Sequence, residues 1–251
     1  MPNRWLKLTV AYDGARYSGW QFQPDKPTIQ GAVEAAWLEI TQEALRVTAA
    51  GRTDAGVHAL RQVVGFRTET LLSTETLLRA LNAVLPNDVA VLSVEEAHEG
   101  FHATYEAIGK RYRYQIHNGR VPSVFERNYC WHFPHLLDAT AMHRAGQVLV
   151  GRHDFSSFET AGSERPDSIR TITELTVLRG TVELADRVTI EVAGDGFLYN
   201  MVRTIVGTLV EIGRGTRDEA WISEVLSACD RRRGGQTAPP QGLFLVSVEY
   251  S

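Results

Sequence analysis

The stretch AAGRTDAGVHALRQVVGF, residues 49–66, indicates both the fold and a functional site. Its two ends have the apolar composition of β-strands, and QVVGFRTE (62–69) is predicted to be the strand that leaves the central loop. The loop itself, residues 51–58, holds an arginine, an aspartate and a histidine between and beside two glycines. A plain hairpin needs only a pair of turn residues, so the loop carries more charged groups than its connection requires.

The helices and strands predicted on either side of this stretch follow one another in an order that is known from other folds. Leu6, Leu8 and Val10 alternate as in a strand, and Thr28 can cap a helix whose apolar residues share one face. The predicted elements of the first half are a strand at 4–12, a helix at 28–45, a short strand leading into the loop, a strand at 62–69, a helix at 73–86 and a strand at 88–97. The order β-α-β-β-α-β is that of a ferredoxin-like unit.

The second half is predicted to have a similar order of helices and strands. Its elements are strands at 105–117 and 128–133, a helix at 138–150, strands at 169–179 and 187–194, helices at 197–213 and 218–228, and a final strand at 242–250. The polar stretch 159–168 is expected to be a mobile surface loop. We therefore predict an α+β protein with two ferredoxin-like or RRM-like halves, residues 1–105 and 106–251. Their antiparallel sheets are expected to form a broad platform with helices on one side and a central cleft.

Composition places the chain among ordinary globular proteins. Of its 251 residues, 43% are hydrophobic and 22% charged, and no window approaches the roughly 18 apolar residues of a membrane span. The first residues, MPNRWLKLTVAYDG, lack the apolar core of a secretory signal. Cys130 and Cys229 stand apart without a CxxC pair, which predicts neither a disulfide framework nor a thiolate metal site. We expect a cytoplasmic protein that does not contact membranes.

Arg52 and Asp54 alternate within the loop, so they project to the same side wherever the chain is extended. A neighbouring guanidinium favours the ionised carboxylate, and an ionised aspartate can act as a nucleophile or as a weak base. Gly51 and Gly56 permit a ligand to approach closely. The plain alternative is that Thr53 and Asp54 only close a turn.

His58 follows Asp54 by four residues and is a further candidate. Together the two would suit a metal-dependent hydrolase. A single histidine without a second ligand cluster is, however, more often a hydrogen-bonded structural residue.

Another candidate lies in the apolar helix FLYNMVRTIVGTLVEIG, residues 197–213. Arg203 is its one charged residue before Glu211. Such an arginine either forms an ion pair or extends to solvent from the edge of the buried face, because an unpaired buried charge is costly. Asp54 is the predicted partner in the first alternative.

The strand KRYRYQIHN, residues 110–118, alternates two arginines with two tyrosines. Arg111 and Arg113 share one face, and Tyr112 and Tyr114 share the other. Arginines that bind phosphate and tyrosines that stack on bases suit a strand facing nucleic acid, whereas two core tyrosines opposite solvated arginines suit an ordinary sheet. The net charge of −4 indicates no general affinity for nucleic acid, so the first alternative depends on local clusters.

Six motifs in order along the chain resemble the tRNA pseudouridine synthase A family. They are AYDGARYSGWQFQ, AGRTDAGVHA, FHATYEAIGKRYRYQI, GRHDFSSF, FLYNMVRTIVG and TAPPQGLFLVSVEY, and the resemblance extends over residues 6–250. The resemblance implies an isomerase without cofactor or metal that converts uridine to pseudouridine at about positions 38 to 40, in the anticodon stem-loop of tRNA. It also implies a homodimer whose basic cleft binds the tRNA.

The same resemblance assigns roles to individual residues. Asp54 falls on the catalytic aspartate, Arg203 on the arginine that pairs with it, and Tyr112 on a tyrosine that contacts the substrate. Arg52 falls on an arginine associated with the cleft and with flipping the target base out of its stack. The remaining predicted substrate contacts are His58, Arg111 and Arg113.

The chain departs from the family pattern at Asn200, where histidine is common before MVR, and at Pro240 and Gln241 in APPQG. These differences concern contacts to the edge of the substrate. Three routes stay open for Asp54: addition to uracil C6, attack on the sugar C1′, or loss of a C2′ proton through a glycal. The alternative from the fold alone is an RNA-binding protein without catalysis, which gives no reason for an aspartate among arginines.

Overall fold

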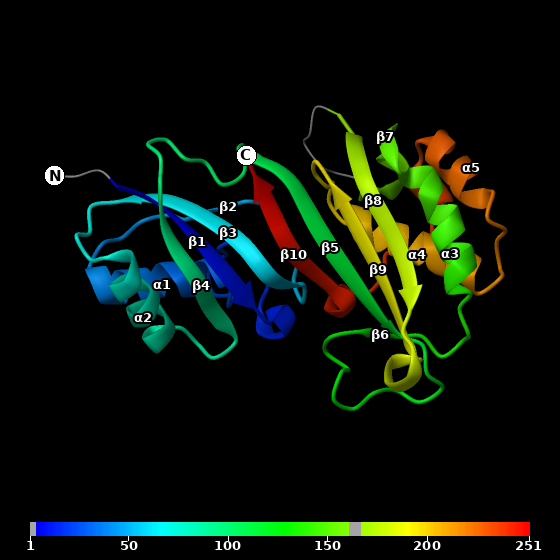
Figure 1. The fold of residues 1–251 in the computed structure, drawn as a ribbon, viewed down its shortest axis with the longest axis horizontal. Coiled ribbons are helices and arrows are strands. Elements are labelled where there is room, and N and C mark those ends of the chain that lie inside the picture. The colour runs from blue at the N-terminus through cyan, green and yellow to red at the C-terminus, as the bar shows by residue number, and fades with distance from the viewer. Residues whose placement is uncertain (1–3, 161–166) are drawn as a thin grey trace. The chain divides into compact units, whose positions relative to one another are not determined.

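The structure is a computed structural model that describes residues 4–160 and 167–251, and it divides into two compact units (Figure 1). Unit 1 comprises Met1–Ile108 and Phe244–Ser251, and unit 2 comprises Gly109–Leu243. Helices and strands occur in both units, which confirms the α+β class. Most of the predicted surface loop, residues 161–166, lies outside the described residues.

Unit 1 has the predicted β-α-β-β-α-β order. Its elements are β1 (Arg4–Tyr12), α1 (Ile29–Thr41), β2 (Thr48–Ala49), β3 (His58–Thr68), α2 (Thr74–Val84), β4 (Val89–Ala97) and most of β10 (Leu243–Tyr250). Strands β4, β1 and β3 are antiparallel neighbours, and the short strand β2 also pairs with β3. This arrangement is that of a ferredoxin-like unit.

The last strand differs from the expected division of the chain. β10 runs parallel to β3, with Phe244 opposite His58 and Leu245 opposite Ala59. This pairing ties the C-terminal strand to unit 1, whereas the division at residues 105 and 106 assigned it to the second half. It also makes the sheet mixed and not purely antiparallel.

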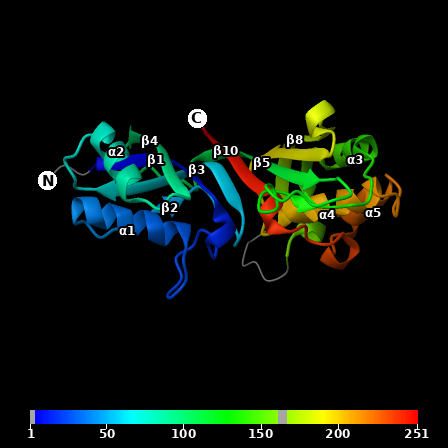
Figure 2. The ribbon, with the colours of Figure 1, turned by 90° about the horizontal axis from the view of Figure 1, so that it is seen from below.

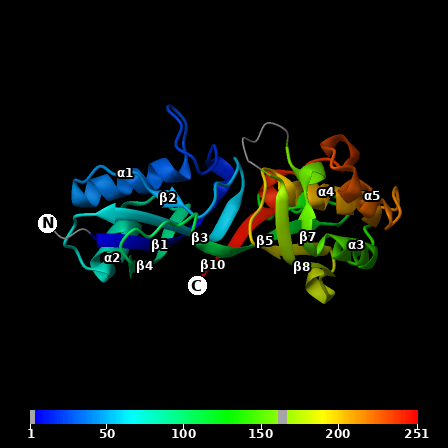
Figure 3. The ribbon, with the colours of Figure 1, turned by 90° about the horizontal axis from the view of Figure 1, so that it is seen from above.

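The core of unit 1 follows from the alternation on β1. Leu6, Leu8 and Val10 are fully buried. Leu6 lies opposite Phe66 of β3, so the two share a face, and the ring of Trp37 from α1 meets that of Phe66 edge-on at a centroid distance of 4.7 Å. Helix α1 therefore packs along this face of the sheet (Figure 3).

Unit 2 is built on a four-stranded antiparallel sheet in the order β5-β9-β8-β7, with β6 parallel to β5. Its elements are most of β5 (Ala107–His117), β6 (Trp131–His132), α3 (Ala139–Gly146), β7 (Gly151–Asp154), β8 (Ile169–Arg179), β9 (Arg187–Gly194), α4 (Met201–Gly213) and α5 (Trp221–Ala228). Helix α4 packs against both α3 and α5 (Figure 2). None of the helices in the described ranges is long and apolar enough to cross a membrane.

Several element ends differ from the predicted ones for local reasons. Helix α1 stops at Thr41 because Gln42 takes a left-handed φ of +59°, and α4 starts only at Met201 because Asn200 has a φ of +61°. Strand β7 was not predicted, since its four residues carry no apolar alternation. Short 3-10 helices occupy Gly14–Arg16, Gln147–Leu149, Ser156–Phe158, Val182–Leu184, Arg231–Arg233 and Pro240–Gly242.

Candidate active site

The loop that carries Asp54 joins β2 to β3 in unit 1 and contains a tight turn. The amide of Val57 donates to the carbonyl oxygen of Asp54 over 3.1 Å. Gly56 within this turn has a φ of +78°, which glycine adopts without steric cost. The turn that the sequence suggested is therefore present, and main-chain atoms of residue 54 close it.

Side chains along the loop alternate in exposure. Arg52 is exposed, Thr53 is buried, and Asp54 is half-buried. The Thr53 hydroxyl lies 2.8 Å from the Tyr12 hydroxyl, and the Thr53 carbonyl accepts a hydrogen bond of 2.9 Å from the amide of Trp20. Thr53 thus holds the loop to the body of unit 1, while the residues on either side of it are more open, as an extended alternation predicts.

His58 lies in a packed environment at the start of β3. Its side chain is 2% exposed and its ring stacks on that of Phe244 at a centroid distance of 4.7 Å. The Nδ1 atom accepts a hydrogen bond of 3.1 Å from the amide of Gly14 and lies 3.0 Å from a carboxylate oxygen of Asp13. RNA can reach this ring only if unit 1 rearranges. The described residues contain no group of three His, Cys, Asp or Glu side chains that could hold a metal ion.

In unit 2, Tyr112 and Tyr114 share the buried face of β5, as the alternation predicts. Tyr112 is 8% exposed, and its ring meets that of Phe197 edge-on at 5.0 Å. Tyr114 is fully buried and its hydroxyl donates to the carbonyl of Pro239 over 2.7 Å. Burial raises the pKa of Tyr114 well above its usual value, and the nearby positive charge of Arg203 opposes that rise.

Arg111 and Arg113 lie on the other face of β5 and are paired with glutamates. Arg111 contacts Glu174 at 2.8 Å and Glu191 at 3.4 Å, and Arg113 contacts Glu191 at 2.7 Å. Partly exposed ion pairs of this kind contribute only about 0–1 kcal/mol, so a phosphate can replace the glutamates. In this state, however, the glutamates offset much of the positive charge that the sequence suggested.

Arg203 projects from the first turn of α4 and is held by polar partners within unit 2. Its Nε atom donates to the carbonyl of Ala238 over 2.7 Å, and its Nη1 atom donates to the side-chain oxygen of Asn200 over 2.7 Å. Asn200 in turn donates to the Thr160 hydroxyl over 2.8 Å. The guanidinium is thus fixed in place and does not extend freely to solvent.

Sequence reasoning missed Asn200 and Tyr114 as parts of this arrangement. Asn200 appeared only as a departure from the family pattern, yet it precedes α4 and binds the Arg203 side chain directly. Tyr114 and Arg203 bind the adjacent carbonyls of Pro239 and Ala238. The available signal was the sequence APP, residues 238–240. Proline has no main-chain N–H to donate, so a segment with two prolines cannot form regular main-chain pairing, and its carbonyls can accept hydrogen bonds from side chains.

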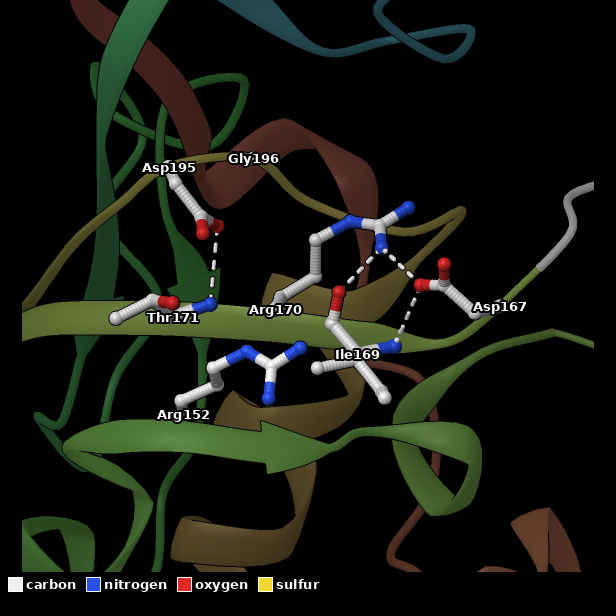
Figure 4. Close-up of a pocket in the computed structure, with 7 residues that line it drawn as sticks. All are labelled: Arg152, Asp167, Ile169, Arg170, Thr171, Asp195 and Gly196. Atoms are coloured by element: carbon white, nitrogen blue, oxygen red, sulfur yellow. Dashed lines mark hydrogen bonds and ion pairs between the residues drawn. The ribbon is translucent and has the colours of Figure 1, made fainter.

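A polar pocket of about 330 Å³ lies elsewhere in unit 2, beside the start of β8 (Figure 4). It is lined by Arg152, Asp167, Ile169, Arg170, Thr171, Asp195 and Gly196. Asp167 accepts a hydrogen bond of 3.1 Å from Arg170, and Asp195 accepts one of 2.9 Å from the amide of Thr171. Two guanidinium groups are thus balanced by two carboxylates, so the pocket has little net charge with which to attract an anion.

Comparisons with known proteins assign the chain to a family. The family profile described as tRNA pseudouridine synthase matches residues 8–106 and 145–251. The tRNA pseudouridine synthase A of Moorella thermoacetica is 48% identical over 98% of this chain and 99% of its own, and that of a Geobacillus species is 45% identical over 98% of each. A solved Cbf5–Nop10–Gar1 complex is far more distant, with a TM-score of 0.35 and 13% identity over 81% of this chain and 53% of that chain.

The chain belongs to the tRNA pseudouridine synthase family, a class of isomerases that act on uridine in tRNA. Within that class, the relatives that match almost its whole length are named tRNA pseudouridine synthase A, which confirms the resemblance carried by the six motifs. The matched regions contain Asp54 and Arg203, while the strand with Tyr112 falls in the interval between them.

Proposed function

We propose that the protein isomerises uridine to pseudouridine at position 38, 39 or 40 in the anticodon stem-loop of tRNA, with Asp54 as the catalytic carboxylate. The observation that carries this proposal is the AGRTDAGVHA loop, whose aspartate lies within the region matched by the family profile. The relatives' names support tRNA as the substrate, and the motif resemblance supports the anticodon stem-loop.

The reaction breaks the bond between uracil N1 and sugar C1′, turns the base, and joins C5 to C1′. N1 gains a proton and C5 loses one, so the reaction is redox-neutral and we propose no cofactor for it. An ionised Asp54 can add to uracil C6, attack C1′, or promote loss of the C2′ proton. All three routes need a carboxylate held in one place beside the nucleoside, which fits an aspartate in an anchored loop.

Other residues take supporting roles in this proposal. Arg203 orients the Asp54 carboxylate, and Tyr112 contacts the uracil and assists removal of the C5 proton. A base inside a stem must first leave its stack at a cost of a few kcal/mol, and Arg52, which is exposed, fills the vacancy and offsets part of that cost. Arg111 and Arg113 exchange their glutamate partners for tRNA phosphates.

The motif resemblance also supports a cytoplasmic homodimer with a basic cleft that binds tRNA. A dimer is directly testable, because sedimentation equilibrium of the pure protein measures its mass in solution. A monomer at the concentrations of the activity assay would remove this part of the proposal and leave the reaction unaffected.

Tritium release from tRNA labelled at uridine C5 tests the catalytic assignment, because C5 must lose its hydrogen when it bonds to C1′. We expect the wild-type protein to release tritium and Asp54→Ala or Asp54→Asn to release none, with tRNA binding retained within a few-fold. Normal release by both variants would remove Asp54 from the mechanism.

Tritium release, together with a chelator and the mass of the recovered RNA, separates the two other candidate functions. An RNA-binding protein without catalysis binds tRNA and releases no tritium. A metal-dependent hydrolase loses activity with a chelator and yields RNA fragments, whereas the proposed isomerase is indifferent to chelation and leaves the tRNA mass unchanged.

A further inference from the structure

Gly19 lies directly against the backbone of the Asp54 loop. It has a φ of +92°, and a β-carbon at this position would lie 2.8 Å from the carbonyl oxygen of Thr53 and 3.1 Å from the amide nitrogen of Ala55. The same β-carbon would lie 3.2 Å from the carbonyl carbon of Asp54. These are backbone atoms, so they cannot give way as a flexible side chain can. A side chain at residue 19 must therefore displace the loop or residue 19 itself by tenths of an ångström.

Gly19 belongs to a longer segment, residues 12–20, that follows the loop at several points. The amide of Trp20 and the hydroxyl of Tyr12 bind the main chain and the side chain of Thr53, respectively. Near the other end of the loop, a β-carbon on Gly14 would lie only 2.0 Å from the carbonyl oxygen of Val57. The 12–20 segment thus contacts the loop before, at and after Asp54, and two of these contacts are possible only because the segment carries no side chain there.

The 12–20 segment is itself fixed at its centre. The amide of Asp13 donates to the carbonyl of Asp88 over 2.9 Å. The Asp88 carboxylate accepts from the Tyr17 hydroxyl over 2.6 Å and from the Nε atom of Arg16 over 3.0 Å. Asp88, the residue immediately before β4, therefore holds the backbone of the 12–20 segment in place independently of the Asp54 loop.

We propose that the 12–20 segment positions Asp54 for catalysis, with Gly19 as the positioning residue whose lack of a side chain sets where the Asp54 backbone lies. The inference rests on the proposed function of Asp54. A catalytic carboxylate must be held close to its productive position, and a misplacement of 1 Å can cost about 100-fold in rate. Gly19 touches no substrate in this scheme and acts only through residues 53–55.

Gly19→Ala tests the proposal, with Gly100→Ala as its matched control. Gly100 also lies in unit 1 with a left-handed φ, +82°, but a β-carbon there meets nothing within 4 Å. Both variants incur the strain of alanine at positive φ, and only Gly19→Ala meets the Asp54 loop. At saturating tRNA we expect kcat to fall several-fold, up to about 10-fold, for Gly19→Ala, with KM and tRNA affinity close to wild type, because the displacement is only a fraction of 1 Å. Gly100→Ala should keep the wild-type kcat.

A second pair of variants decides the matter even if Gly19→Ala does not fold. Tyr12→Phe removes the hydroxyl that contacts Thr53 and keeps the ring. Its control is Tyr250→Phe, which removes a hydroxyl bound to the carbonyl of Ala103 over 2.6 Å in the same unit. Tyr250→Phe loses this one hydrogen bond, whereas Tyr12→Phe loses the contact with Thr53 and a weaker one of 3.4 Å from the Gln62 amide, so both substitutions lower stability. We expect only Tyr12→Phe to lower kcat, several-fold and without a matching change in KM.

The proposal is overturned if each variant and its control lose kcat equally when all are folded, or if the losses appear in KM and not in kcat. Asp54→Ala in the same assay keeps the two questions apart. An inactive Asp54→Ala beside a fully active Gly19→Ala refutes the positioning role and leaves the proposed function standing. An active Asp54→Ala refutes the proposed function itself.

Discussion

Arg203 and Ala238 are joined by two reciprocal hydrogen bonds. The Nε atom of Arg203 donates to the Ala238 carbonyl over 2.7 Å, and the Ala238 amide donates to the Arg203 carbonyl over 3.0 Å. Ala238 is fully buried. The first turn of α4 and the chain segment before β10 therefore hold one another, and the guanidinium is the part of this contact that a substitution can remove.

Arg203→Ala should lower both stability and activity. It leaves the buried Ala238 carbonyl without the side-chain donor, which costs about 1–3 kcal/mol of unfolding free energy. If Arg203 also orients Asp54, kcat should fall far more than the folded fraction does. Urea denaturation and single-turnover kinetics on the same preparation measure the two effects.

Asn200→Ala is the control for this prediction, because it removes one partner of the guanidinium and leaves Arg203 in place. It should lower stability with a smaller loss of kcat. An Arg203→Ala variant with unchanged kcat would show that the role assigned to this arginine is mistaken.

Arg113→Ala should weaken tRNA binding in a salt-dependent way. If this guanidinium leaves Glu191 to bind a phosphate, its removal should reduce the slope of log K against log salt concentration by about 1. Arg144→Ala is the matched control, since Arg144 is also a partly exposed arginine in an ion pair, with Glu219. Equal slopes for the two variants would show that Arg113 does not contact a tRNA phosphate and serves only in its ion pair on the sheet surface.

Tyr112→Phe keeps the ring that packs against Phe197 and removes only the hydroxyl. We expect tRNA affinity close to wild type, because stacking needs only the ring. Tyr112→Ala removes a buried ring and should cost about 3 kcal/mol or more of stability, together with a higher KM. Filter binding and thermal unfolding measure these changes, and a large loss of affinity in Tyr112→Phe would assign the contact to the hydroxyl instead.

The free energy of unfolding at alkaline pH should depend on the ionisation of Tyr12. Burial raises the pKa of Tyr12 to about 12, while in the unfolded chain it ionises near pH 10. Its stabilising contribution is therefore complete below about pH 10 and is lost as the pH rises toward 12, at up to about 1.4 kcal/mol per pH unit. The free energy of unfolding of Tyr12→Phe should fall less steeply over this range. If the free energies of unfolding of the wild type and of Tyr12→Phe fall with pH at the same rate, burial does not raise the pKa of Tyr12 as described.

Much of the fold followed from apolar periodicity. The strands at 4–12, 169–179 and 187–194 were predicted at their observed bounds, and the first and the last of them bury every second residue over most of their length. The pairing of β10 with β3 was not predictable in this way, since periodicity identifies a strand and not its partner. Nor was the left-handed Gln42 that ends α1, because glutamine is not the usual residue for that conformation.

The sequence indicated which residues to examine as a candidate site, but it did not predict most of the contacts that these residues make. The spacing of Arg52 and Asp54 indicated a reactive loop, and alternation correctly grouped the tyrosines of β5 on a buried face. His58 carries an imidazole that suggested binding, but its stacking on Phe244 depends on a strand almost 190 residues away in the chain. The glutamates that pair with Arg111 likewise come from other strands, Glu191 from β9 and Glu174 from β8, which only the folded sheet brings near it.

The most direct test of the central claim is a map of pseudouridine in tRNA that lacks the modification, after incubation with the pure protein or with Asp54→Asn. We predict new pseudouridines at position 38, 39 or 40 with the wild-type protein and none with the variant, although both bind the tRNA. Pseudouridine formed equally by Asp54→Asn, or formed by the wild type only outside the anticodon stem-loop, would contradict it.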